Sequence, residues 1–304
     1  MPRILLATPE GIHTFDDRGV PGPVHHAGRD VKTVAPQQNE VWAVVDGSEL
    51  WNTADMGGWT RVGDIGNYRG TCVAGTDGDV FVGSSEARLF RVAAGQGLEP
   101  VASFDRVDGR GAWYTPWGGP PDTRSISEWD EAIYVNVHVG GILRTEDRGQ
   151  TWTPTIDIDS DVHQVTTAEG LVLAACAGGL AVSSDRGRNW TLRSDGLEAP
   201  YSRAVAVCGD AILLSASHGP RGGQSAVYRG DLSGDGLDLE RCRAGLPEWF
   251  DDNVDSYCLD ALPNGSFVAF GTSDGRLFAS DDTGIGWAEL ASGLPPIRRV
   301  LVMP

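Results

Sequence analysis

The amino-acid sequence predicts an all-β protein built from seven four-stranded antiparallel blades, and three observations carry this prediction. A short motif with an aspartate, a glycine and a tryptophan recurs along the 304 residues. Predicted strand starts follow one another at a spacing close to the roughly 40 residues that one four-stranded blade needs. Glycine and proline contribute 41 and 17 residues, a share above the average but below that of disordered chains.

The recurring motif has the pattern Ser/Thr-x-Asp-x-Gly-x-x-Trp. Complete copies occupy residues 145–152, 183–190 and 280–287, and a copy at residues 53–59 is one residue short. The pattern favours a tight turn between two strands, in which glycine takes a positive φ and the aspartate accepts hydrogen bonds from nearby backbone amides. We therefore interpret the motif aspartates as structural residues rather than catalytic ones.

Seven predicted strands each begin one blade. Their starts lie near Lys32, Thr71, Arg124, His163, Arg203, Tyr257 and Arg298. Four of the six steps between equivalent apolar residues of these strands are 39 to 41 residues long, and the other two are 53 and 54. The two long steps predict insertions at residues 105–122 and at about residues 217–224 and 247–254, on the face where the first strands start.

The last predicted blade is incomplete, because the sequence ends after one strand at residues 298–303. Two strands at residues 3–8 and 11–16 have no inner partner of their own. We expect both termini to build a shared closing blade, since radial closure leaves no long sheet edge exposed. The prediction is one seven-bladed β-propeller domain that covers residues 1–304.

The motif resembles the Asp-box, or BNR repeat, of sialidase-like propellers, and the resemblance covers the whole chain. Sialidases bind a substrate carboxylate with three arginines and use a tyrosine nucleophile. The resemblance implies an equivalent set made of Arg124, Arg203, Arg298 and Tyr257. Sialidases have six blades and an early Arg-Ile-Pro motif, whereas this chain has seven predicted blades and Arg3-Ile4-Leu5. We therefore do not expect sialidase activity.

The chain is also similar to two other groups of BNR propellers. Photosystem II assembly factors of this type have seven blades and bind a protein chain through arginine-rich positions. Stand-alone bacterial BNR-like proteins have about the same length as this chain. The first group implies a non-catalytic interaction scaffold or assembly factor as an alternative function.

Charge and cysteine content exclude several classes of protein. A net charge of −18 argues against a nucleic-acid-binding surface. The longest nearly apolar stretch, residues 171–182, is too short to span a bilayer. Five cysteines without paired spacing favour a reducing environment. We expect a cytoplasmic protein with neither nucleic acid nor membrane as its partner.

Positive charge gathers at the predicted blade starts of this acidic protein. The residues concerned are Lys32, Arg124, His163, Arg203 and Arg298, with Arg299 as the neighbour that a shift of one residue would select. Arginine binds carboxylate, phosphate and sulfate groups through paired hydrogen bonds, so the pattern predicts a central site for an anionic ligand. The alternative is that these cations pair with acidic loop residues such as Asp161 and Asp255.

The first predicted insertion carries Trp113 and Trp117 among glycines and prolines. Aromatic side chains on a rigid loop stack well on a sugar, a ring or an acyl chain. We expect both tryptophans to cover the ligand. The alternative is that they close the central channel as a plug.

Three histidines are predicted near the same face: His138, His163 and His218. Imidazoles from adjacent blades can bind a divalent transition metal and leave a coordination position open. The alternative is acid–base chemistry, with His163 and Tyr257 transferring protons.

The sequence therefore predicts a propeller that binds a small anionic ligand at its central channel. Whether it is an enzyme stays open. An enzyme would use either hydrolase- or lyase-type acid–base chemistry or metal-assisted chemistry. The alternative is a scaffold that takes an acidic peptide.

Overall fold

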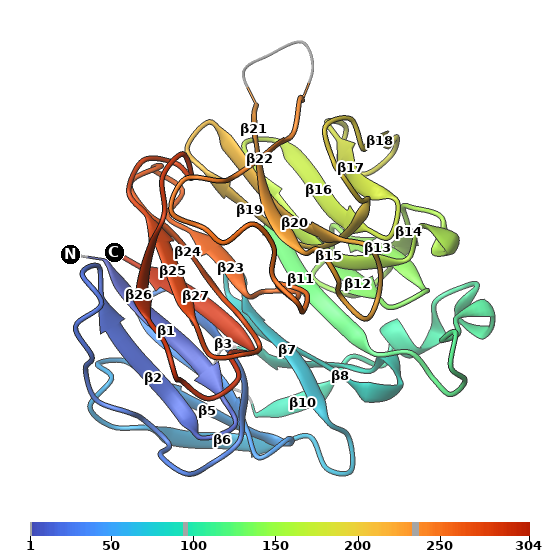
Figure 1. The fold of residues 1–304 in the computed structure, drawn as a ribbon. Helices are drawn as coiled ribbons and strands as arrows, with labels where there is room; N and C mark the ends of the chain where they lie inside the picture. The colour runs from blue at the N-terminus through green and yellow to red at the C-terminus, as the bar shows by residue number, and fades with distance from the viewer. Residues whose placement is uncertain (1, 94–96, 233–236) are drawn as a thin grey trace. The chain divides into compact units, whose positions relative to one another are not determined.

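The computed structural model describes residues 2–93, 97–232 and 237–304, and the regular secondary structure of these residues is almost entirely β-strand. Seven antiparallel sheets follow one another along the chain, six with four strands and one with three (Figure 1). This order is that of a seven-bladed β-propeller closed by its two termini, so the predicted fold class is confirmed. Within the described ranges, no helix has the length and hydropathy that a membrane span requires.

Contacts divide the chain into two compact units. The first unit comprises residues 1–28, 174–181 and 191–304, and the second comprises residues 29–173 and 182–190. That the whole chain forms one domain stays a prediction.

The second unit contains three complete blades. The first of them consists of β3 (Val31–Gln37), β4 (Glu40–Val45), β5 (Glu49–Thr53) and β6 (Thr60–Asp64). The next consists of β7 (Gly70–Gly75), β8 (Asp79–Ser84), β9 (Leu89–Ala93) and β10 (Leu98–Pro100). The third consists of β11 (Thr123–Trp129), β12 (Ala132–Val137), β13 (Gly141–Thr145) and β14 (Thr153–Pro154). Strands β8 and β12 are buried at every position, which explains why they are apolar runs without alternation.

One blade has residues in both units. It consists of β15 (Val162–Ala168), β16 (Leu171–Cys176), β17 (Gly179–Ser183) and β18 (Thr191–Arg193). Its first strand belongs to the second unit and contacts β11 and β12 there. A short 3-10 turn, η4 (Ile158–Ser160), leads into β15.

The first unit contains two complete blades. One consists of β19 (Tyr201–Cys208), β20 (Ala211–Ser217), β21 (Ala226–Asp231) and β22 (Glu240–Arg241). The other consists of β23 (Leu259–Ala261), β24 (Val268–Gly271), β25 (Leu277–Ser280) and β26 (Ala288–Ala291). Buried aromatic rings pack between them: Phe270 stacks on Phe278, and Phe250 meets both rings edge to face.

Both termini form the closing blade of the first unit, as predicted. Its sheet order is β2 (Gly11–Asp16), β1 (Arg3–Thr8), β27 (Arg299–Met303), with β1 and β27 side by side near the labelled chain ends (Figure 1). The fourth strand is missing from this sheet. Residues 21–25 follow the edge of β2 through isolated bridges from Pro21 and His25 only. Pro21 and Pro23 lack the backbone N–H that a regular ladder needs, which explains the interruption.

The recurring motif forms the same turn each time. In the copy at residues 145–152, the Gly149 amide donates to Thr145 Oγ1 at 2.8 Å, and the Thr151 amide donates to Asp147 Oδ1 at 2.9 Å. Equivalent bonds occur in the copies at residues 183–190 and 280–287. Gly149 has a φ of 82°, which few other residues adopt. The motif aspartates therefore stabilise turns, as their sequence pattern indicates.

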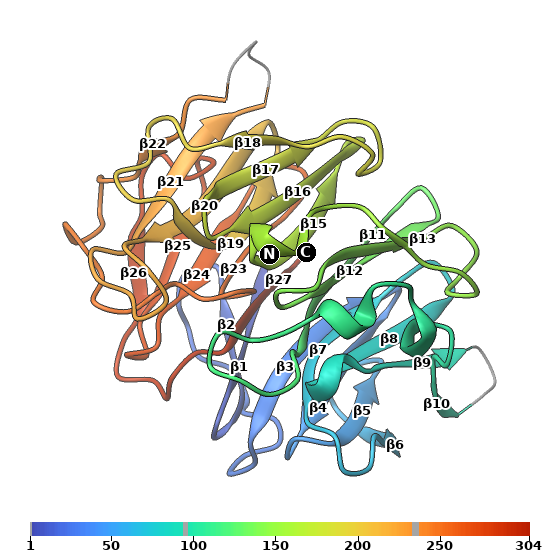
Figure 2. The same ribbon diagram turned by 90° about the vertical axis from the view of Figure 1, so that its right-hand side faces the viewer.

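The predicted insertion at residues 105–122 connects β10 to β11 (Figure 2). It includes most of η2 (Phe104–Arg106) and all of η3 (Arg110–Ala112). The Arg110 guanidinium donates to the carbonyls of Glu86 and Ala87, beside the turn η1 (Ser85–Ala87). These bonds fix the insertion to the end of β8.

Candidate functional site

The first strands of four blades have a β-bulge near their start. Pairing slips by one residue at Lys32 in β3, at Thr71 in β7 and at Arg124 in β11. Strand β19 has the same slip between Ser202 and Val205, a segment that contains Arg203. A bulge leaves one residue out of the ladder and re-aims its side chain, and bulges often occur next to functional sites. The predicted blade-start residues are thus set apart by backbone geometry as well as by charge.

Arg203 and Tyr257, two of the predicted site residues in the first unit, contact other side chains of the protein. Arg203 Nη1 lies 3.3 Å from Asp255 Oδ1, and its guanidinium lies 5.4 Å from the centre of the Tyr201 ring. Strand β27 begins at Arg299, and Arg298 is the residue before it. The Arg299 guanidinium lies only 3.7 Å from the centre of the Tyr257 ring. Arg203 therefore follows the alternative prediction, in which a cation at a blade start pairs with an acidic residue of the protein, here Asp255.

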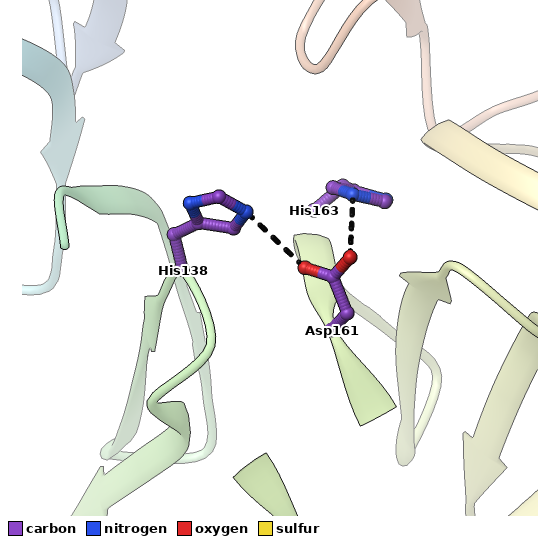
Figure 3. Close-up of side chains that lie close together, drawn as sticks. All are labelled: His138, Asp161 and His163. Carbon is purple, nitrogen blue, oxygen red and sulfur yellow. Dashed lines mark ion pairs between the residues drawn. The ribbon is translucent and has the colours of Figure 1, made fainter. Parts of the chain in front are cut away.

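His138 and His163 meet at one carboxylate in the second unit (Figure 3). His138 lies in the turn after β12, where its backbone amide donates to the Asp122 carbonyl at 3.0 Å. His163 is the second residue of β15. Asp161 lies between η4 and β15 with a φ of 46°, in the left-handed region that aspartate tolerates better than most residues. Three short backbone segments therefore direct these side chains toward one point.

Each of the two imidazoles lies close to the Asp161 carboxylate. His138 Nε2 lies 3.2 Å from Asp161 Oδ1, and His163 Nε2 lies 3.6 Å from Asp161 Oδ2. One donor atom from each residue lies within 4.8 Å of the other two. The His163 side chain is fully buried, that of His138 is 4 % exposed and that of Asp161 is 23 % exposed. The cluster is thus enclosed but accessible through Asp161.

Asp161 is ionised in this environment. Burial by itself raises the pKa of its carboxyl group, but the close contacts with the imidazoles of His138 and His163 outweigh burial and hold the pKa well below its usual range. A carboxylate with two imidazoles beside it can position a proton on either ring, and it can also bind a cation.

A hydrogen bond between elements keeps the cluster in place. Asn136, near the end of β12, donates from Nδ2 to the carbonyl of Val162 at 3.0 Å. Val162 stands between Asp161 and His163, and Asn136 is fully buried. The bond therefore fixes β12 against the segment that carries two of the three site residues. Sequence reasoning did not find Asn136, because only the fold brings it beside Val162.

The two tryptophans of the 105–122 insertion have different environments. The Trp117 ring lies 5.0 Å from the His138 ring at an angle of 32° and stays 69 % exposed. Trp113 is partly buried between Phe104 and the Arg110 guanidinium. Trp117 therefore presents an exposed ring beside His138, whereas Trp113 packs within the insertion.

His218 belongs to the first unit, where its backbone amide donates to the Gly223 carbonyl at 3.1 Å. The two parts of the predicted second insertion contact each other there. The Gly223 amide donates to the Asp251 carbonyl at 2.8 Å, and Ser217 bonds Asn253. A role for His218 in a metal site stays a prediction. The structure adds a different third group, Asp161, to the pair formed by His138 and His163.

Asp161 was predicted only as an acidic partner for the cationic positions. A signal for its larger role does exist in the sequence, since Asp161 and His163 stand two residues apart at a strand start. That signal is short, and the distance to His138 follows only from the fold. The structure thus makes Asp161 the centre of the cluster.

Comparisons with known proteins identify the fold but assign the chain to no family. The sequence matches no protein-family model and no curated protein. Among solved structures, YCF48 from Cyanidioschyzon merolae superposes with a TM-score of 0.61 at 14 % identity, over 90 % of this chain and 94 % of that chain. A second structure, YCF48 bound to D1 peptide, gives a TM-score of 0.61 at 14 % identity, over 99 % of this chain and 95 % of that chain.

An ancestral GH74 enzyme also has this fold, with a TM-score of 0.62 at 16 % identity. The match covers 85 % of this chain but only 38 % of the enzyme, which is therefore much longer. The similar structures include a peptide-binding protein and an enzyme. Because one fold carries many functions, the choice between them rests on the site.

Proposed function

We propose that the protein binds an anionic ligand at the bulged starts of its first strands, with Arg124 as the main cation in the second unit. The observation that carries this proposal is the repeated bulge, which sets Lys32 and Arg124 apart from the ladders in a protein of net charge −18. A guanidinium fixed by a bulge is suited to paired hydrogen bonds with a carboxylate, phosphate or sulfate group.

Arg124 and the histidine cluster are near each other in the β-sheet. Thr123 pairs with Val137, so the bulge at Arg124 lies beside the last residue of β12, directly before His138. Trp117 lies on the His138 ring and exposes most of its surface. An anionic group at Arg124 would therefore place the rest of the ligand next to an exposed aromatic face, as in sites for sugars and ring compounds.

A second candidate is an interaction scaffold that binds an acidic peptide. The likeness to the YCF48 structure bound to D1 peptide favours it, since the match covers nearly the whole of both chains. A peptide carboxylate and a small acid would use the same cationic positions. The two candidates differ in what lies beyond the anionic group.

Family and location are part of the same proposal. The three turns of identical geometry support a place among the Asp-box propellers of bacteria. All five cysteines are buried thiols outside any disulfide, which supports a reducing cytoplasm.

The test compares Arg124→Gln with Arg188→Gln, which removes the same charge from an exposed turn of the second unit. Probes are phosphate, glucuronate, and an acidic peptide with either a free or an amidated C-terminus. Losing a charge-assisted hydrogen bond should weaken binding of an anionic probe by about 10- to 100-fold in Arg124→Gln. Titration calorimetry should show unchanged affinity in Arg188→Gln.

Equal affinity of the two variants for every probe would reject Arg124 as the anchor. Binding of the free peptide alone, with no binding of glucuronate or phosphate, would select the scaffold over the small-molecule site. Amidation of the peptide should then abolish binding, since it removes the carboxylate.

A further inference from the structure

We infer that His138, Asp161 and His163 form a binding site for one divalent transition-metal ion. The inference goes beyond the proposed function, because an anionic ligand at Arg124 requires no metal. It rests on the geometry, burial and donor types of three residues that all belong to the second unit.

The distances fit a coordination sphere. Zinc lies about 2.0 to 2.2 Å from histidine nitrogen and carboxylate oxygen, so adjacent ligand atoms are about 3.0 to 3.5 Å apart. The separation between His138 Nε2 and Asp161 Oδ1 is 3.2 Å, and that between His163 Nε2 and Asp161 Oδ2 is 3.6 Å. The three donor atoms lie within 4.8 Å of one another, so side-chain adjustments of about 1 Å would place them around one ion.

One carboxylate oxygen of Asp161 has no well-directed hydrogen-bond donor. Asp161 Oδ1 is buried, and its contact with His138 is not aligned as a hydrogen bond. A buried carboxylate oxygen without a well-directed donor is costly. A cation needs no such directed N–H bond and would satisfy this oxygen while it binds the lone pair of each imidazole.

The donor set selects the class of metal. Two imidazoles and one carboxylate suit Zn²⁺ and Fe²⁺ better than Mg²⁺ or Ca²⁺, which prefer oxygen ligands. Three protein ligands leave at least one coordination position for water or a ligand oxygen. The exposed part of Asp161 and the Trp117 ring beside His138 place that position on the accessible side of the cluster.

The site is also supported by its surroundings. The Asn136 side chain bonds the Val162 carbonyl, and the His138 amide bonds the Asp122 carbonyl. Both bonds hold ligand-bearing segments without using a ligand atom. A site whose backbone is fixed in this way loses little conformational freedom when it binds an ion.

The experiment uses the full chain, purified without a histidine tag, stripped with a chelator and titrated with Zn²⁺ alone. Calorimetry should show one ion per chain, and Co²⁺ should give the visible absorption of a site with nitrogen and oxygen ligands. His163→Ala and Asp161→Asn should each weaken Zn²⁺ binding by on the order of 100-fold or more, since each removes one of three ligands.

Asp161→Asn is the sharper variant, because asparagine keeps the size of the side chain and tolerates the left-handed φ at this position. His13→Ala, which removes an imidazole from β2 in the first unit, is the matched control and should keep the affinity within about threefold. Circular dichroism and thermal unfolding establish that each variant is folded.

The inference is wrong if the wild-type chain binds Zn²⁺ more weakly than about 100 µM, or if folded Asp161→Asn binds it as well as wild type. A His–Asp–His proton network without metal would give that result. The outcome is separable from the proposed function. Arg124→Gln should keep its affinity for Zn²⁺ within about threefold and lose only the anionic ligand.

Discussion

Aspartates in two regions of this protein have different kinds of partner. In the turns of the recurring motif, each aspartate accepts hydrogen bonds from residues of its own turn, as Asp147 does from Gln150 and Thr151. Before the first strand β15, Asp161 faces one side chain from the turn after β12 and one from β15. A repeated local bond stabilises the fold, whereas a single long-range cluster marks a candidate site.

Two further aspartates, one from each region, have pKa values that are shifted in opposite directions. Hydrogen bonds from Asn189 lower the pKa of Asp185 in a motif turn to about 2. In β23, the first strand of its blade, burial raises the pKa of Asp260 to about 6, against the hydrogen bond from the Val302 amide. The comparison therefore predicts that aspartates of the two regions respond to substitution and to pH in different ways.

The largest effect is expected at Asp260. The pKa of the Asp260 carboxyl group is 3.8 in the unfolded chain and about 6 in the folded chain. Its ionisation therefore does not destabilise the fold below pH 4, and it destabilises the fold increasingly as the pH rises through 6. Replacement by asparagine keeps an acceptor for Val302. The free energy of unfolding of Asp260→Asn relative to wild type should therefore rise by about 1 to 3 kcal/mol between pH 4 and pH 8.

Part of Asp260 stays in contact with solvent, which screens the carboxylate. The expected change in the free energy of unfolding is therefore smaller than the full difference in pKa would give. Urea denaturation at several pH values measures the change. A difference in stability between the two proteins that is independent of pH, or that falls as the pH rises, would contradict a raised pKa of Asp260.

A smaller loss is expected for Asp147→Ala in a motif turn. The substitution removes the acceptor of the amides of Gln150 and Thr151 and of the Thr145 hydroxyl, so the turn keeps the bond from Gly149 to Thr145 but loses these three. By analogy with a lost helix cap, the free energy of unfolding should fall by about 1 to 2 kcal/mol. Thermal or urea denaturation measures the loss.

Binding provides the control for this variant. Folded Asp147→Ala should bind Zn²⁺ and anionic probes with wild-type affinity, because none of its bonds reaches the histidine cluster. Loss of either affinity without loss of stability would show that the motif aspartates serve function as well as structure.

The smallest change in stability is expected for Trp117→Ala. The ring is 69 % exposed, so its removal should change the free energy of unfolding by no more than about 0.5 kcal/mol. A ligand that stacks on it should bind about 5- to 10-fold more weakly. Trp113→Phe, a conservative change in the same insertion, is the comparison, and equal affinities of the two variants would exclude Trp117 as a contact.

The sequence predicted the blades well because each blade carries its own local signal. The residues placed at the strand starts, Lys32, Thr71 and Arg124, are the bulge residues of β3, β7 and β11. The last strand starts at Arg299, one residue after the prediction. Two adjacent arginines give no alternation, so the register there depends on the partner strand β1.

The candidate site was predicted only in part. His138 and His163 were expected near one face, and they do share a cluster, but their link is Asp161. The left-handed backbone of Asp161 and the approach of β12 to β15 decide that link. Neither of these two features follows from a spacing in the sequence.

The sequence alone determined the all-β class, the blade length, the motif turns and the closing strands, because strand periodicity and turn chemistry act between residues close along the chain. Tertiary structure decided which polar side chains meet. Asp161, His138 and Asn136 stand up to 26 residues from their partners, and their contacts form only when adjacent sheets pack. Packing distances are set by the whole fold, so the site became visible only in three dimensions.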